Sequence, residues 1–265
     1  MASGDTHSKQ RDNDNPRDPV FPDAVLWDMD GTLVDTEEYW FAAEAGLMAD
    51  HGIAWSQRDS LEMVGTSEKQ MISTMRSRGL PLSGDQIVAE LNNRVIEGAT
   101  HHVSLFPGVL ELLLDCHTQG IPTALVTNSR RRLASVVQHH LDTFARQRGW
   151  DGGRLFDVAV TSDLGLEPKP SPAPYTFAAR RLAALHIQRS EQPLDVRRMV
   201  AFEDSLPGVR SAVTAGIYTV GVANRAPLED SEAHVVVKSV DGLTLEGLGE
   251  LVRATHHAPE GRTTP

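Results

Sequence analysis

The stretch Val25-Leu26-Trp27-Asp28-Met29-Asp30-Gly31-Thr32 is an apolar run that ends in two carboxylates. The run predicts a buried strand, and Gly31 permits a sharp turn directly after it. Because side chains alternate along an extended chain, Asp28 and Asp30 are expected on one face if the strand continues through them. Open α/β sheets bind ligands beside the carboxyl ends of their strands, so this stretch predicts a functional site. An ordinary turn with two capping carboxylates is the alternative.

The pattern of the remaining chain predicts the fold class. No strand is expected between residues 35 and 105, where helices are predicted at 37–52, 56–63, 67–78 and 83–99. Helices and strands then alternate, with helices at 109–119, 131–141, 174–185 and 208–215, and strands at 122–126, 156–161, 199–202, 218–222 and 235–237. Strands separated by helices pair in parallel through right-handed crossovers, which predicts an α/β fold with a doubly wound parallel sheet.

The same pattern divides the chain into segments. We expect a disordered N-terminal arm at 1–20, a core domain formed by 21–34 and 106–255, a helical cap domain at 35–105, and a flexible tail at 256–265. The glycine-containing stretch 143–153 is predicted to be a surface excursion from the core.

Composition excludes several classes of protein. The formal net charge is −11, which argues against a binder of nucleic-acid phosphates. The single cysteine, Cys116, excludes disulfides within one chain. The first twenty residues contain no apolar segment, so we do not expect them to be a signal peptide, and no run of about eighteen apolar residues could span a membrane. We therefore expect a cytoplasmic protein, monomeric or weakly dimeric, whose partner is a small molecule.

Polar groups also follow two of the later strands. Thr127 and Asn128 follow the strand at 122–126 and offer hydrogen-bond donors to phosphate oxygens. A plain capping turn is the alternative there, and it accounts well for Ser129. Lys169 stands between prolines that keep the backbone extended, where a fixed cation suits both a phosphate and a carboxylate. A solvated loop lysine is the alternative.

Glu203 and Asp204 end the strand at 199–202, where another capped turn is the alternative. Together with Asp28 and Asp30 they place carboxylates on separate strand ends, and such groups can neutralise one another only through a cation. An all-oxygen donor set is the preference of Mg²⁺. The histidines form no helix-spaced pair with an acid, so zinc is disfavoured.

The order and content of these four motifs resemble the haloacid dehalogenase superfamily, whose first motif is Asp-x-Asp-x-Thr. Over residues 23–240 the chain is similar to the branch that contains β-phosphoglucomutase and small sugar-phosphate phosphatases, with a helical cap after the first motif. The resemblance implies phosphate-ester chemistry through an aspartyl-phosphate. The implied ligands of Mg²⁺ are Asp28, the backbone carbonyl of Asp30, and Asp204, with Glu203 acting directly or through water.

The resemblance also implies roles for single residues. Asp28 is the implied nucleophile, and Asp30 is the implied acid that protonates the leaving alcohol and the base that later activates water. Thr127 and Lys169 are implied to hold the phosphoryl oxygens, with Asn128 as a further substrate-binding group.

Two departures from the family pattern favour a phosphatase over a sugar phosphomutase. Trp40 stands where the mutase has a histidine that supports proton transfer. Glu68, which follows Gly65-Thr66-Ser67, replaces an arginine that grips a second phosphate, and its charge would repel such a group. The predicted function is Mg²⁺-dependent hydrolysis of a small phosphorylated metabolite, a sugar or polyol phosphate. A phosphomutase and a non-catalytic binding module are the alternatives.

Substrate specificity is expected to reside in the cap, which opens and closes over the site. The candidates for substrate contact in the cap are Tyr39, Trp40, Met63, Gly65, Thr66, Ser67 and Lys69. Packing within the cap is the alternative interpretation of Trp40 and Met63.

Overall fold

The computed structural model of the chain describes residues 20–63, 66–188, 193–224 and 227–256. The expected disordered arm, apart from Val20, and the expected tail beyond His256 lie outside these residues, as does Gly65. Within the described ranges, no helix combines the length and the apolar character needed to cross a bilayer.

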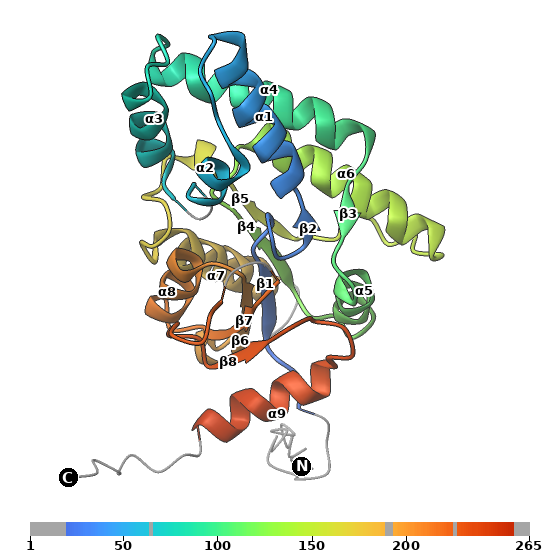
Figure 1. Cartoon of the computed structure of the whole chain (residues 1–265). Helices are drawn as coiled ribbons and strands as arrows, with labels where there is room; N and C mark the ends of the chain where they lie inside the picture. Colours follow the sequence, from blue (N-terminus) through green and yellow to red (C-terminus); the bar gives the residue numbers. More distant parts are fainter. Residues whose placement is uncertain (1–19, 64–65, 189–192, 225–226, 257–265) are drawn as a thin grey trace, which may run out of the picture.

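A six-stranded parallel sheet in the order β5-β4-β1-β6-β7-β8 forms the centre of the lower part of the molecule in Figure 1. Its strands are β1 (Ala24–Trp27), β4 (Thr123–Val126), β5 (Val158–Val160), β6 (Met199–Glu203), β7 (Tyr218–Val222) and β8 (Val235–Val237). The strand order reverses at β1, which lies between β4 and β6. The doubly wound α/β fold is thus confirmed, and the point of reversal is where such sheets bind ligands.

Strand β1 is apolar throughout because both of its faces are covered. All four of its residues are buried, and the register pairs Trp27 with Leu125 of β4 and with Phe202 of β6. The rings of Trp27 and Phe202 stack with their centroids 4.3 Å apart. This packing holds the end of the strand rigidly, and the next residue, Asp28, is delivered to the carboxyl edge of the sheet.

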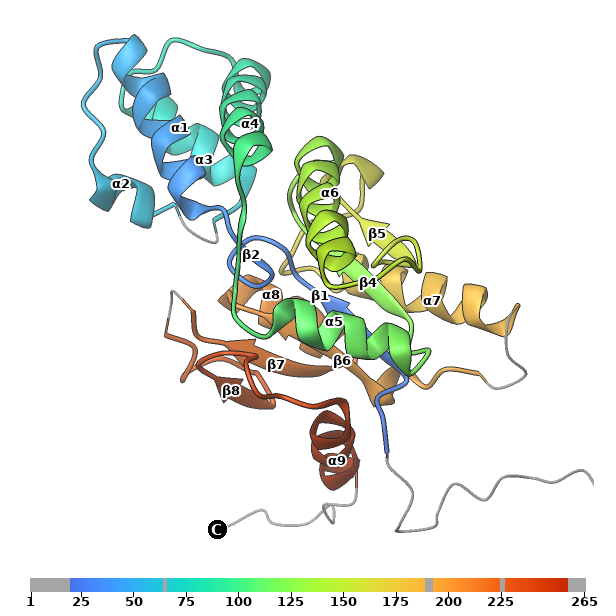
Figure 2. The same ribbon diagram turned by 90° about the vertical axis from the view of Figure 1, so that its right-hand side faces the viewer.

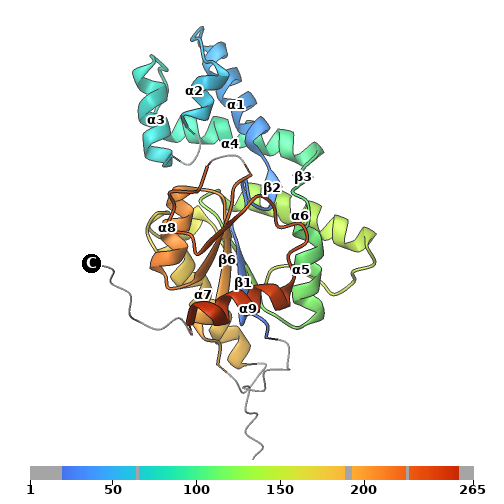
Figure 3. The same cartoon turned by 60° about the horizontal axis from the view of Figure 1, so that its bottom comes forward.

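Helices cover both faces of the sheet (Figures 2 and 3). One face carries α5 (Val109–Thr118), α6 (Arg131–Gln147) and α9 (Leu245–His256), and the other carries α7 (Ala173–Ile187) and α8 (Leu206–Thr214). The 3₁₀ turns η1 (Ser162–Leu164) and η2 (Val196–Arg198) lie in connections. Alternate residues of β1 divide between the two cores, since Val25 and Trp27 pack with the first set and Ala24 and Leu26 with the second.

The helices α1 (Glu37–Asp50), α2 (Gln57–Leu61), α3 (Glu68–Ser77) and α4 (Gly84–His101) form a helical unit above the carboxyl edge of the sheet (Figure 1). Two short antiparallel strands, β2 (Val34–Asp35) and β3 (Ser104–Leu105), connect this unit to the core. The expectation of no strand between residues 35 and 105 is wrong, because two-residue strands carry no periodic pattern. The motion of this unit as a cap and the exact domain boundaries stay predictions.

Two helices differ from the sequence-based expectation. Helix α6 continues to Gln147, so residues 143–147 of the expected excursion at 143–153 are helical. Leu141 and Ala145 extend the buried stripe of this helix. Helix α9 was not expected, although buried Leu245, Leu248 and Val252 recur at helical spacing.

The first strand is also shorter than expected. It ends at Trp27 instead of continuing through Asp30, because Gly31 adopts φ +86° and Asp30 forms an isolated bridge with Val34. The condition under which Asp28 and Asp30 were expected to share one face, a strand that runs straight through both, is therefore not met, and a tight turn after the strand sets the position of Asp30.

Candidate active site

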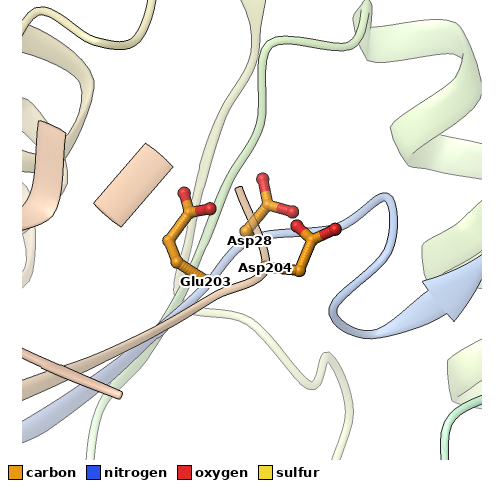
Figure 4. Close-up of side chains that lie close together, drawn as sticks. All are labelled: Asp28, Glu203 and Asp204. Carbon is orange, nitrogen blue, oxygen red and sulfur yellow. The ribbon is translucent and has the colours of Figure 1, made fainter. Parts of the chain in front are cut away.

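Three acidic side chains meet where β1 and β6 end. Asp28 follows β1, Glu203 is the last residue of β6, and Asp204 follows it; all three are buried. Figure 4 shows their carboxyl groups gathered at these strand ends, and each offers an oxygen that lies within 4.8 Å of the others. Parallel strands that end at one edge of the sheet bring together acids that are far apart in the sequence.

Lys169 lies among these acids, with its side chain only 4% exposed. Its Nζ donates hydrogen bonds to Asp28 Oδ1 at 2.5 Å, to Glu203 Oε1 at 2.6 Å and to the backbone oxygen of Val126 at 2.8 Å. The Tyr175 hydroxyl donates to the same Glu203 oxygen at 2.7 Å. The interpretation of Lys169 as a solvated loop residue is therefore excluded.

The charges at this edge of the sheet do not balance, because three carboxylates face one ammonium. Burial raises the pKa of Asp204 well above its usual value, and repulsion from Asp28 and Glu203 adds to the rise. Burial also raises the pKa of Glu203 to about 7, against the attraction of Lys169. Burial disfavours the charged form of Lys169, but the nearby carboxylates outweigh that cost and raise its pKa.

The surplus negative charge and the all-oxygen donor set fit a divalent cation. Hydrogen bonds already engage one oxygen of each acid: Asp28 Oδ1 and Glu203 Oε1 accept from Lys169, and Asp204 Oδ1 accepts from the Thr32 hydroxyl at 3.2 Å. The second oxygen of Asp28 and of Asp204 accepts no hydrogen bond from the described residues. These acids could therefore hold a metal ion without losing their present partners.

Asp30 is held by three hydroxyl groups. Thr36 Oγ1 donates to its Oδ1 at 2.5 Å, and Ser129 Oγ and Thr127 Oγ1 donate to its Oδ2 at 2.6 Å and 3.4 Å. Burial raises the pKa of Asp30, and these hydrogen bonds oppose the rise. A carboxyl group with a raised pKa is suited to carry a proton to a leaving group. The interpretation of Ser129 as a helix cap is wrong, because Arg130 is the N-cap of α6 and the Ser129 hydroxyl turns to Asp30.

The substrate-binding candidates of the core and of the helical unit differ in position. Asn128 is exposed beside Thr127, and its Oδ1 accepts a hydrogen bond from the backbone N–H of Lys169 at 3.2 Å. In the helical unit, half-buried Trp40 packs against the larger hydrophobic core, the Thr66 hydroxyl donates to a backbone oxygen, and Ser67 caps α3. Among the described residues, no hydrogen bond or ion pair joins these three side chains to the acidic cluster.

Several groups that shape the site carry no motif in the sequence. The Tyr175 ring belongs to α7, and nothing in its local sequence indicates that its hydroxyl reaches Glu203. Thr32, in contrast, is the last residue of the Asp-x-Asp-x-Thr motif, and Thr36 is the N-cap of α1, so a search for hydroxyl groups around the two first carboxylates could have found both.

Comparison with known proteins agrees with this geometry. A family model described as a haloacid dehalogenase-like hydrolase matches residues 22–216, well over half of the chain. The chain belongs to the haloacid dehalogenase-like hydrolase family. The resemblance inferred from the four motifs is confirmed, and the protein is an enzyme of the hydrolase class.

Relatives of this hydrolase cover most of its length. The bifunctional riboflavin kinase/FMN phosphatase of Arabidopsis thaliana is 30% identical over 75% of this chain, and the match spans 48% of that longer protein. The probable pseudouridine-5'-phosphatase of Saccharomyces cerevisiae is 28% identical over 88% of this chain and 93% of its own length. The crystal structure of CbbY from Rhodobacter sphaeroides in complex with phosphate has a TM-score of 0.69 and 26% identity, over 86% of this chain and 99% of that one.

Replacing Gly31 with alanine in this hydrolase is expected to weaken divalent-cation binding by about 10- to 100-fold, because it disturbs Asp204, one of the acids that could hold the ion. An added Cβ would lie 2.0 Å from Asp204 Oδ2, and the backbone at Gly31 has φ +86°. Isothermal titration calorimetry with Mg²⁺ checks the affinity. Gly52→Ala is the matched control, since Gly52 has φ +70° and nothing lies within 4 Å of its Cβ position. If both variants lose affinity equally, backbone strain and not the clash is responsible.

Proposed function

We propose that the protein is a Mg²⁺-dependent phosphomonoester hydrolase that acts on a small phosphorylated metabolite, a sugar or polyol phosphate, through an aspartyl-phosphate. The observation that carries the proposal is the contact of Lys169 Nζ with Asp28 Oδ1 inside the buried acidic cluster. A lysine that orients one aspartate, beside a second aspartate with a raised pKa, suits a two-step phosphoryl transfer. Two relatives carry the word phosphatase in their names, which supports this chemistry.

In the first step, an oxygen of Asp28 attacks phosphorus, the ester P–O bond breaks, and Asp30 gives its proton to the leaving alcohol. In the second step, Asp30 takes a proton from water, whose oxygen attacks phosphorus and breaks the bond to Asp28. Thr127 and Asn128 lie beside these groups and supply donors to the phosphoryl oxygens. Lys169 holds the Asp28 carboxylate and contributes positive charge near the phosphoryl group.

The residues that would hold Mg²⁺ are Asp28, Asp204 and the backbone carbonyl of Asp30, with Glu203 acting directly or through water. When bound, the ion supplies positive charge that offsets the negative charge of the phosphoryl oxygens and of the acids. Lys169 and Tyr175 both donate to Glu203 Oε1, whereas Oε2 accepts a longer hydrogen bond from Ser205 Oγ at 3.4 Å.

The test is phosphate release from a broad panel of phosphorylated metabolites, with Mg²⁺ and with a chelator. We expect metal-dependent release, with sugar and polyol phosphates among the best substrates. Conversion of sugar 1-phosphates into 6-phosphates without release would instead identify a phosphomutase. No turnover in either assay would favour a binding module and contradict the proposal.

A further inference from the structure

An ion pair joins the helical unit to the core at the edge of the candidate site. Arg130 Nη2 lies 3.7 Å from Glu68 Oε2, and both side chains are about half exposed. Glu68 is the first residue of α3, and Arg130 directly follows Ser129, whose hydroxyl contacts Asp30. The pair therefore connects the helical unit to the loop that carries the hydroxyl groups of the site.

Arg130 stands where positive charge is unfavourable for its own helix. It is the N-cap of α6, and Arg131 and Arg132 follow it, so three cations crowd the positive end of the helix dipole. Asp163 offsets part of this charge by accepting the backbone N–H of Arg131. Glu68 is the carboxylate of the helical unit that faces Arg130. Such a cluster of positive charge attracts anions, and Glu68 shields it.

There is room beside this pair for a further chemical group. A cavity of about 400 Å³ lies between α4 and the beginning of α6, and Arg130 and Arg132 are part of its wall, with Asn92, Asn93, Asp85 and Asp163 among the other lining residues. Arg132 Nη1 donates to Asn93 Oδ1 at 3.1 Å, so one of the two arginines is already engaged with α4. Glu68 does not line this cavity, but an anionic group in it would meet Arg130, the residue with which Glu68 pairs.

We propose that Glu68 and Arg130 form a charge gate that selects substrates whose only anionic group is the reacting phosphate. This inference rests on the proposed phosphatase function and names the substrate class of the same site. Glu68 repels a second phosphate that approaches Arg130. The uncharged remainder of a monophosphate substrate is not repelled, because Glu68 and Arg130 together carry no net charge. The related CbbY of Rhodobacter sphaeroides was crystallised as a mutant with xylulose-(1,5)bisphosphate. The gate would distinguish the present hydrolase from a relative that accepts a bisphosphate.

The test uses Mg²⁺-dependent hydrolysis of p-nitrophenyl phosphate, inhibited by fructose 6-phosphate or by fructose 1,6-bisphosphate. The ratio of the two inhibition constants measures discrimination against the second phosphate. Glu68→Gln removes the repelling charge and frees Arg130, so we expect the ratio to shift toward the bisphosphate by about 3- to 10-fold. Arg130→Gln is expected to shift it the other way, because Glu68 then stands unpaired. In the double variant the gain from Glu68→Gln should disappear.

Glu62→Gln is the matched control, since it removes the same charge from an exposed position of the helical unit. Glu62 pairs with Arg58 of α2 at 3.4 Å and not with the core, so the ratio should stay unchanged. An unchanged ratio in Glu68→Gln, or an equal gain in Glu62→Gln, overturns the gate while hydrolysis of p-nitrophenyl phosphate continues. Absence of hydrolysis in the wild-type protein overturns the phosphatase proposal itself, so the two failures are distinguishable.

Discussion

Replacing Asp28 with asparagine is expected to lower phosphate release at least about 1,000-fold while the protein stays folded. The amide carries no negative charge and is a poor nucleophile, so the covalent intermediate cannot form. Lys169 Nζ, which now contacts Asp28 Oδ1 at 2.5 Å, would meet only a neutral oxygen. The side chain keeps its size and shape, and the loss therefore reports the chemistry of the carboxylate.

The fold should tolerate this change because it relieves repulsion. Asp28 raises the pKa of both Asp204 and Glu203, and Lys169 keeps its contacts with Glu203 Oε1 and with the Val126 backbone oxygen. Phosphate release and thermal unfolding followed by circular dichroism are the two measurements. Asp115→Asn makes the same chemical change at an exposed position of α5 and should leave both unchanged. Substantial release from a folded Asp28→Asn protein would sink the nucleophile assignment.

Replacing Lys169 with methionine is expected to abolish activity and to lower the free energy of unfolding by about 3–5 kcal/mol at ~pH 8, because it breaks a buried ion pair by removing one partner. Methionine fills similar space, but Asp28 and Glu203 lose their shared cation and stay buried. This cost adds to the loss of the contact that orients the proposed nucleophile.

The loss of unfolding free energy caused by Lys169→Met should become smaller as the pH falls. Burial raises the pKa of Glu203 to about 7 even with Lys169 present, and loss of that attraction raises it further. A carboxyl group whose folded-state pKa exceeds its unfolded-state value binds its proton more tightly when folded. Its contribution to stability is therefore lost as the pH rises through the interval between the two values. We expect the variant to lose more stability than the wild-type protein between ~pH 5.5 and ~pH 8.

Urea unfolding of the metal-free protein at both pH values checks this prediction. Lys238→Met removes an exposed lysine and should change the free energy of unfolding by less than about 0.5 kcal/mol. The double variant Lys169→Met, Glu203→Gln should recover part of the loss, because it also removes one of the unpaired charges. A loss that is equal at both pH values, with no recovery in the double variant, would contradict the electrostatic explanation.

The elements of the fold that local patterns could predict are those with a sustained apolar period. Strands β7 and β8 occupy the predicted residues 218–222 and 235–237. They could be predicted because strands of a parallel sheet are rich in apolar and β-branched residues. Strands β2 and β3 escaped prediction because each has two residues and exists through pairing with a distant partner. The predicted end of α6 was too early, because the glycines at 149–153 indicated a loop and the preceding residues were assigned to it.

The sequence by itself determined which chemical groups stand at the strand ends, since an apolar run followed by a polar residue is a local pattern. Asp28, Thr127, Glu203 and Asp204 follow from that pattern, and the order of the motifs indicated the family. Their positions could be predicted because parallel strands share one carboxyl edge.

Only the tertiary structure decided which of these groups touch. In the tertiary structure, Lys169 contacts both Asp28 and Glu203. The Ser129 hydroxyl donates to Asp30 instead of capping α6, and Glu68 forms an ion pair with Arg130. The physical reason is that a side chain's partner and its pKa depend on burial and on charges supplied by distant segments. Those surroundings exist only once the sheet and the helical unit have assembled, so no local pattern contains them.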